Sequence, residues 1–297
     1  MSSLHYRGAV WQLLAAQVLI GSVGVFVHEG GQDAVTTVFY RCLFGALFLG
    51  GWGLLQGQFR GLWRERRLLL GALASGVLLV LSWVSLFAGM AHASIGVATM
   101  LFHCYPFVML VLAALLLRER TPVASWLWTL TAFAGLLLTA DPQRLFGHIG
   151  AGYRTGIVLA LLSGVLCGAS LLMSRQLSRQ RPVAVVFVQC SVGTLMLAGF
   201  ANGAALLPGP HWLWLAGLGV IHSGIAYVLS YSAYRQLPVG MIAVLSFIYP
   251  LVALLLDYLL YGQRLGPLQL AGLALIVLGS LGVSLKWPLR RDHASAG

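Results

Sequence analysis

Two charged residues stand inside otherwise apolar stretches of the chain, and they are the first candidates for chemistry. Arg41 lies within the stretch 34–55, and Asp257 lies within the stretch 239–261. An isolated charge is costly inside a membrane, so each side chain must face protein, water or a counter-ion. Arg41 is expected to contact a substrate anion such as a carboxylate, or to form a structural pair, or to reach the outer surface. Asp257 either pairs with Arg41 at a similar depth, couples to protons or binds an amine, or meets solvent at its helix end.

Aromatic and hydroxyl side chains mark one face of the stretch 212–233. The residues that share this face at helical spacing are Ser223, Tyr227, Ser230, Tyr231 and Tyr234. A polar aromatic stripe is predicted to face a cavity. Trp83 aligns with Tyr227 in an internal repeat, so rings are expected on both sides of a central pocket that suits a flat or cationic organic ligand. Alternatively, Tyr231 and Tyr234 belong to the aromatic belt at the membrane surface.

Other polar side chains within apolar stretches are also candidate substrate contacts. These are Gln17, His103, Tyr105, His222 and Tyr249. Each histidine either titrates near neutral pH and couples protons, or serves as a hydrogen-bonding core residue. Gln17 either binds polar substrate groups or bonds a neighbouring helix.

Pro106 and Pro250 fall near the centres of two apolar stretches. Each proline removes an amide donor and frees the carbonyl four residues earlier, at Phe102 and Ser246. Matched interrupted helices at the middle of a membrane point to the binding region and to a hinge of a transporter, whereas packing alone is the alternative reason for a kink.

The composition decides which class of protein positions these residues. Of 297 residues, 59% are hydrophobic and 8% are charged, against about 25% charged in a soluble domain. The apolar runs reach about 20 residues, the length of a membrane-spanning helix, so a water-soluble fold is excluded. Ten spans are predicted near 8–27, 34–55, 68–89, 95–117, 124–140, 157–174, 183–201, 212–233, 239–261 and 266–285.

The net charge of +11 reports orientation, because the basic residues sit in short loops beside the apolar spans. With the amino terminus in the cytoplasm, the inside regions hold 14 basic residues and the outside loops hold three. Both termini are therefore predicted to be cytoplasmic, in a multi-pass protein of the bacterial inner membrane. We expect no nucleic-acid partner.

Motifs for catalysis are missing from the sequence. It has no GxxxxGK[ST] loop and no Ser/His/Asp or metal-ligand cluster with usable spacing. The four cysteines, which lie in apolar runs without CxxC spacing, are expected to act as small hydrophobic residues: Cys42, Cys104, Cys167 and Cys190. We expect no enzyme activity, no cofactor and no metal, and a gradient as the driving force.

The two halves of the chain resemble each other at a shift of 144 to 148 residues. The pair Tyr105 and Pro106 falls on Tyr249 and Pro250, and Cys42 falls on Cys190. Each half has five predicted spans, so the second copy must enter the membrane in the opposite sense. The expected fold is therefore an all-α membrane protein of ten transmembrane helices in two inverted five-helix repeats, 1–143 and 152–289.

These motifs resemble the EamA family of the drug/metabolite transporter superfamily. The similar segments are Phe39-x-Arg41, Tyr105-Pro106 with the LLRER sequence of 116–120, and Tyr249-Pro250 with the YGQR sequence of 261–264. The second half departs from the family pattern, since Gln263 stands where a glutamate is usual. The resemblance implies a central cavity lined mainly by helices one to four and six to nine, with helices five and ten on the periphery.

The expected function is a secondary transporter that exports small amphipathic metabolites, such as amino acids, related compounds or drugs, by alternating access. Import of a nutrient such as a choline-like cation or a nucleoside is the alternative. The expected partners are a small-molecule substrate and the lipid bilayer, with a homodimer through helices five and ten as a further option.

Overall fold

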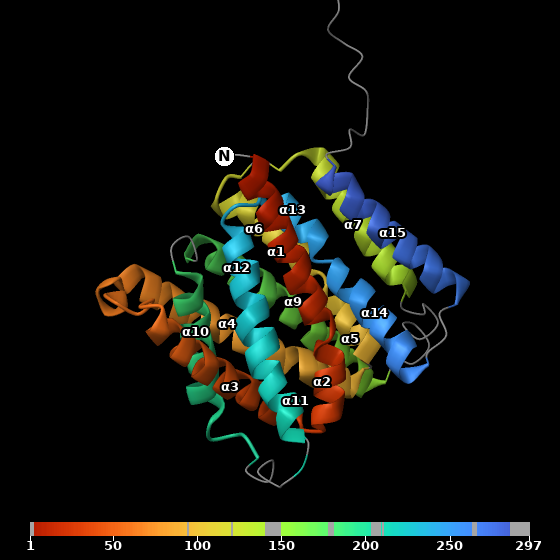
Figure 1. Ribbon diagram of the computed structural model, residues 1–297. Helices are drawn as coiled ribbons and strands as arrows, with labels where there is room; N and C mark the ends of the chain where they lie inside the picture. The colour runs from red at the N-terminus through yellow and green to blue at the C-terminus, as the bar shows by residue number, and fades with distance from the viewer. Residues whose placement is uncertain are drawn as a thin grey trace, which may run out of the picture.

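The computed structural model describes residues 3–93, 95–119, 121–139, 150–177, 181–202, 209, 211–262 and 266–285. All regular secondary structure in these ranges is helical, which confirms the predicted class. Figure 1 shows the helices packed as one bundle, with α7 and α15 side by side along one edge.

The helices follow one another with short connections. The first half forms α1 (Ser3–Gly21), α2 (Val23–Gly30), α3 (Ala34–Leu55), the 3₁₀ turn Leu62–Arg64, α4 (Arg66–His92), α5 (Ile95–Phe102), α6 (Tyr105–Leu116) and α7 (Val123–Thr139). The second half forms α9 (Ala151–Leu177), α10 (Pro182–Leu197), α11 (His211–Gly217), the π-helix Leu218–Ala226, α12 (Tyr227–Tyr234), α13 (Val239–Leu245), α14 (Ile248–Tyr261) and α15 (Pro267–Ser284).

Several helical segments are long and apolar enough to cross a membrane. In the described ranges there are seven: Tyr6–Gly30, Ala34–Leu55, Arg66–His92, Val97–Leu116, Ala151–Leu177, His211–Tyr234 and Val239–Leu260. The fifth, seventh and tenth predicted spans coincide with shorter apolar helices, Val123–Leu138, Pro182–Leu197 and Pro267–Val283. At 1.5 Å per residue these three extend about 25 Å, against a hydrocarbon layer of roughly 30 Å.

The two spans that contain the matched prolines are both interrupted. The break between α5 and α6 and the break between α13 and α14 each lie just before a proline, Pro106 or Pro250. At the breaks the amides of His103 and Phe247 bond the carbonyl three residues earlier, at 3.0 and 3.1 Å. A proline offers no amide hydrogen, so the regular α-helical ladder cannot run through either site. The predicted pair of interrupted helices is therefore present.

Two other departures from α-helical geometry were not predicted. Ser22 separates α1 from α2, and its hydroxyl donates to the carbonyl of Leu19 at 2.8 Å. Between α11 and α12, nine residues form the π-helix Leu218–Ala226. Stretches of π-helix frequently lie at functional sites. Hydrophobic periodicity does not distinguish them from ordinary helix.

Small residues allow α3 and α10 to approach each other closely. The thiol of Cys42 on α3 lies against Gly193 on α10, and the thiol of Cys190 on α10 lies against Gly45 on α3. A side chain at either glycine would meet the opposing sulfur. All four cysteines are free thiols, and three of them are buried in the bundle.

The same reciprocity relates the helices at the edge of the bundle. Gly135 on α7 faces the backbone carbonyl of Gly272 on α15, and Gly279 on α15 faces the backbone carbonyl of Trp128 on α7. Gly279 and Gly272 lie 144 residues after Gly135 and Trp128 respectively. The glycines of α15 thus serve packing within this chain.

A third pair of contacts joins each half to the other near the breaks. Gly21 lies against the carbonyl of Tyr249, and Gly168 lies against the carbonyl of Tyr105. Gly168 follows Gly21 by 147 residues, and Tyr249 follows Tyr105 by 144. Equivalent glycines therefore pack against the backbones of equivalent tyrosines in the opposite half of the chain.

The loop before α3 ends in a side-chain cap. The carboxylate of Asp33 accepts hydrogen bonds from the amides of Val35 and Thr36, both at 3.0 Å. Partial burial acts to raise the pKa of Asp33, but the hydrogen bonds from Thr36 and Val35 outweigh it, so the pKa falls below the usual 3.8. The charged form is favoured in the fold, and its stabilising effect is present at neutral pH and lost as the pH falls below about 4.

Replacing Asp33 with alanine should lower the stability of the purified protein at pH 7 by about 1 kcal/mol, the usual value of an N-cap. The difference between Asp33→Ala and the unaltered protein should shrink when the unfolding is measured near pH 3. Asp33→Asn is the matched control, because its amide oxygen still caps the helix without a titratable group. An equal destabilisation by Asp33→Ala at both pH values would contradict this assignment.

Candidate substrate-binding site

Arg41 lies in the interior of the bundle, where it is only 3% exposed. Its guanidinium carbon lies 3.9 Å from the ring centroid of Trp83 and 5.9 Å from that of Tyr227. Its Nε donates to Ser223 Oγ at 2.8 Å. The first half supplies Arg41 and Trp83, and the second half supplies Ser223 and Tyr227, so the cation lies between the two halves.

The guanidinium of Arg41 keeps donors to spare. Among the described side chains, no carboxylate lies within 4 Å of it, and its only hydrogen bond is the one to Ser223. Its two terminal nitrogens make no hydrogen bond to the described residues, so their N–H groups remain for a ligand or for water. The side chain of Asp257, the predicted partner, lies outside the described residues, although its backbone belongs to α14.

Aromatic rings continue from Arg41 along α12. Trp83 and Tyr227 meet edge to face at 5.6 Å, and Tyr227 meets Tyr231 at the same distance. Tyr231 and Tyr234 are 0% and 2% exposed. Their interpretation as part of a surface belt is therefore wrong, because neither ring reaches the outside of the bundle.

The hydroxyl of Tyr231 is occupied by the protein. It donates to Gln189 Oε1 at 3.0 Å, while Gln189 Nε2 donates to Ser75 and Ser174, both at 2.8 Å. This buried network joins α4, α9, α10 and α12 and uses every polar atom of the Gln189 side chain. The hydroxyl hydrogen of Tyr231 is thus already used by Gln189 and is not free to bind a ligand. Gln189 was visible in the sequence as a polar residue within an apolar run.

His222 lies on the π-helix, one residue before Ser223. Its Nε2 is 2.9 Å from Ser22 Oγ, at the junction of α1 and α2. Because that hydroxyl donates to Leu19, Nε2 is the donor of this pair, and Nδ1 is a buried acceptor without a partner among the described residues. The ring also meets Phe26 edge to face at 4.7 Å.

His103 lies at the break between α5 and α6. Its Nδ1 is 2.6 Å from the carbonyl of Thr99, and its ring stacks on Tyr249 with 4.9 Å between centroids. Tyr105 lies 5.7 Å away. The three predicted contacts His103, Tyr105 and Tyr249 therefore come together where the two interrupted helices meet.

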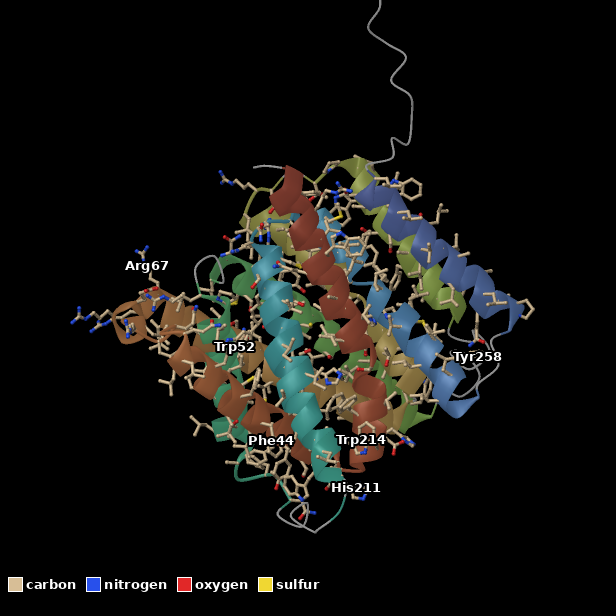
Figure 2. The ribbon with its side chains drawn as sticks, in the orientation of Figure 1. Phe44, Trp52, Arg67, His211, Trp214 and Tyr258 are labelled. Atoms are coloured by element: carbon tan, nitrogen blue, oxygen red, sulfur yellow. The ribbon has the colours of Figure 1, made fainter. Side chains whose placement is uncertain are left out.

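The remaining predicted residues also lie in the interior. Gln17 on α1 is 2% exposed, and Pro106 and Pro250 are buried at the starts of α6 and α14. Figure 2 shows the contrast with Arg67, which extends away from the helices, and with Phe44, Trp214 and His211, which gather where α11 begins.

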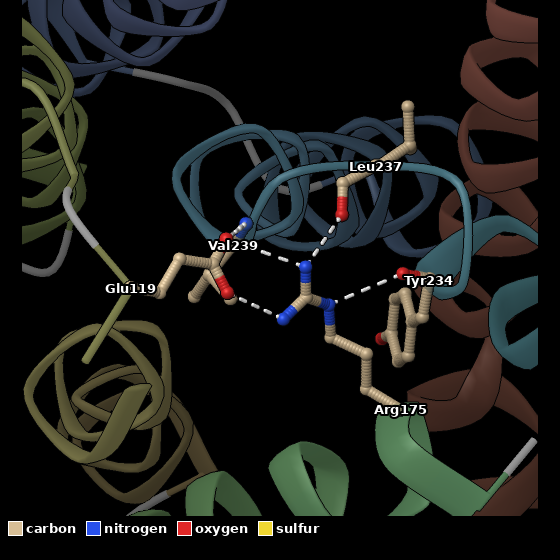
Figure 3. A network of polar contacts seen from close by, with 5 residues as sticks. All are labelled: Glu119, Arg175, Tyr234, Leu237 and Val239. Atoms are coloured by element: carbon tan, nitrogen blue, oxygen red, sulfur yellow. Dashed lines mark hydrogen bonds and ion pairs between the residues drawn. The ribbon is translucent and has the colours of Figure 1, made fainter. Parts of the chain in front are cut away.

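A second polar cluster joins elements at the end of the bundle where α1 begins. Arg175 donates to both carboxylate oxygens of Glu119, at 2.6 and 3.3 Å (Figure 3). It also donates to the carbonyls of Tyr234 and Leu237, and Glu119 accepts from the amide of Val239. Glu119 belongs to the LLRER motif of 116–120, whereas Arg175 was predicted only as one of the 14 basic residues on the inside.

The sequence matches a known family over nearly its whole length. The model of the EamA-like transporter family matches residues 7–140 and 154–285. An uncharacterized transporter of Bacillus subtilis (strain 168), YxxF, is 29% identical over 287 residues, which cover 94% of this chain and 90% of that protein. The pseudopaline exporter CntI of Pseudomonas aeruginosa (strain UCBPP-PA14) is 28% identical over 254 residues, or 84% and 86% of the two chains.

The fold is also similar to that of a known crystal structure. The superposition has a TM-score of 0.78 and covers 94% of this chain and 96% of that chain, at 20% sequence identity. At this identity the likeness concerns the fold alone.

Glu119→Gln should destabilise the purified protein by about 1–3 kcal/mol, because it removes a charge from a bidentate pair that also holds three backbone groups. Glu65→Gln is the matched control, since the single contact of Glu65 with Arg181, at 3.0 Å, is more exposed and should be worth less than about 1 kcal/mol. Unfolding in detergent measures both. Equal effects of the two variants would refute the ranking.

Proposed function

This chain belongs to the EamA-like transporter family, and we propose that it exports small amphipathic metabolites, amino acids or related compounds, across the bacterial inner membrane. It is a multi-pass membrane transporter and not an enzyme. Its relative CntI is an exporter, which supports the outward direction. The transport is secondary, driven by a gradient, and both termini face the cytoplasm.

The proposed mechanism is alternating access between two inverted five-helix repeats. Three reciprocal contacts support it: Cys42 with Gly193 and Cys190 with Gly45, the glycine pairs of α7 and α15, and the two tyrosine carbonyls that meet Gly21 and Gly168. A pair of similar halves related by a two-fold axis produces such exchanged contacts. The arrangement lets each half take the other's conformation in turn and so open a shared site to either side.

Arg41 is the observation that carries the choice of substrate. A buried guanidinium that keeps free terminal donors, with no carboxylate in contact among the described side chains, is suited to a carboxylate supplied by a ligand. The rings of Trp83 and Tyr227 would cover the apolar part of that ligand. Asp257 remains the candidate for proton coupling.

A choline-like cation fits this site less well. The ring of Trp83, the best face for binding a quaternary amine, already holds the guanidinium of Arg41 at 3.9 Å. A second cation there would meet a like charge in a poorly screened interior.

The homodimer through helices five and ten corresponds to an interface formed by α7 and α15. Leu127, Leu130 and Val123 on α7 and Leu268 and Leu270 on α15 are exposed apolar residues. Either lipid or a second copy of this face covers them equally well, so the homodimer stays a proposal.

Arg41→Gln should reduce counterflow of a carboxylate-bearing substrate in proteoliposomes by tenfold or more, since about 1.4 kcal/mol corresponds to a factor of ten. A panel of radiolabelled amino acids and their analogues supplies the substrates. Arg41→Lys should not restore transport, because lysine can neither bond Ser223 in the same geometry nor stack on Trp83. Arg67→Gln, which removes a charge outside the site, is the matched control. Counterflow that survives in Arg41→Gln would overturn the proposal.

A further inference from the structure

His103 presents an unused hydrogen-bond acceptor in the interior of the protein. The carbonyl of Thr99 can only accept, so Nδ1 of His103 carries the hydrogen in their 2.6 Å bond. In the neutral ring Nε2 is then a lone-pair acceptor. The residue is 0% exposed, and Nε2 has no hydrogen-bond partner among the described residues. Buried polar atoms of this kind are rare and call for an explanation.

Four aromatic rings lie near the imidazole of His103. Tyr249 stacks on the imidazole at 4.9 Å, and Phe102, Tyr105 and Phe247 lie at 5.4, 5.7 and 6.2 Å between ring centroids. We call these four rings the aromatic box. The box joins both interrupted helices, since Phe102 and Tyr105 flank one break, while Phe247 lies in the other and Tyr249 follows it.

The repeat shows that the break does not require a histidine. Phe247 follows His103 by 144 residues, and the tyrosine and proline that come next are the same in both copies. Both residues make the same backbone bond to the carbonyl three residues earlier, at 3.0 and 3.1 Å. Phenylalanine thus forms this break without a ring nitrogen. The break therefore does not need the acceptor nitrogen of His103, which is present only in the first copy of the repeat.

We propose that Nε2 of His103 accepts a hydrogen bond from the amine of the substrate, with the faces of Tyr105 and Tyr249 against the cationic nitrogen. Aromatic faces attract an ammonium group, and a neutral imidazole supplies the acceptor that its N–H bonds require. This assignment rests on the proposed function, in which Arg41 holds the carboxylate. The two groups together would bind a substrate that carries both a carboxylate and an amine.

The other unpartnered imidazole nitrogen is a weaker candidate for an amine. His222 precedes Ser223, the residue that accepts the hydrogen bond from Arg41. A substrate ammonium beside His222 would therefore face a like charge. At the aromatic box no cation contacts the ring nitrogen among the described residues. In the present conformation the box is closed, so the amine reaches Nε2 when the helices move at the two breaks.

Three probes with the same apolar body test the assignment: L-phenylalanine, 3-phenylpropionate, which lacks the amine, and 2-phenylethylamine, which lacks the carboxylate. Binding to the purified protein is measured by thermal stabilisation over a range of concentrations. His103→Asn keeps a donor for the Thr99 carbonyl but places no acceptor at the Nε2 position. His103→Gln places an amide oxygen there, and His103→Phe copies the second half of the chain.

His103→Asn and His103→Phe should each weaken binding of L-phenylalanine and 2-phenylethylamine about tenfold, the loss expected for one hydrogen bond to a charged group. Binding of 3-phenylpropionate should change less than about twofold, because the carboxylate site at Arg41 is unaltered. His103→Gln should retain most of the affinity for both amines. Melting temperatures without ligand check that each variant is folded.

The proposal is overturned if the two amine probes fail to bind the unaltered protein, if they bind both variants normally, or if all three probes lose affinity equally. It is also overturned if Asp257→Asn abolishes amine binding while His103→Asn does not. Where 3-phenylpropionate still binds the His103 variants, its loss in Arg41→Gln would preserve the proposed function. If 3-phenylpropionate binding does not depend on Arg41 either, both the proposed function and the assignment of His103 are overturned.

Discussion

The burial of one guanidinium group organises the centre of this protein. Arg41 is held by the face of Trp83 and by a single hydrogen bond to Ser223, and these supports come from opposite halves of the chain. A charge this deep in an apolar bundle is tolerated only where polar groups or water can reach it. Small residues let α3 pack closely against α10 and against the π-helix. These residues matter as much as the cation, because they fix the distance between Arg41 on α3 and its partner Ser223 on the π-helix.

The two halves meet through exchanged contacts and not through a flat interface. In each of three places, a glycine of one half packs against a thiol or a backbone carbonyl of the other half, and the equivalent contact occurs in the reverse direction. Backbone groups packed this closely leave no room for gradual deformation, so movement is expected to concentrate at the irregular segments: the breaks before Pro106 and Pro250, the Ser22 junction and the π-helix. Those segments are also the ones that carry His103 and His222.

Much of this architecture could be predicted from the sequence, because apolar runs of membrane length and a repeated Tyr-Pro pair leave few alternatives. The prolines also located the breaks. The π-helix and the Ser22 junction could not be predicted, since each is too short to leave a distinct period within an apolar run. The repeat predicted Trp83 and Tyr227 on opposite sides of one pocket, and the isolated charge of Arg41 predicted its place in the interior. The partners Ser22 and Gln189 depend on rotamers and crossing angles that sequence spacing does not determine. The network of Arg175 joins a helix end to two distant loops, and such long-range pairing has no local signal.

The carboxylate of Glu119 has no charged equivalent in the second copy of the repeat. The residue 144 positions after Glu119 is Gln263, which can accept hydrogen bonds but carries no charge. An ion pair weakens with dissolved salt while an amide contact barely responds. The contact that joins α9 to the segments around Glu119 and Leu237 therefore responds to ionic strength, and position 263 has no charge with which to reproduce that response.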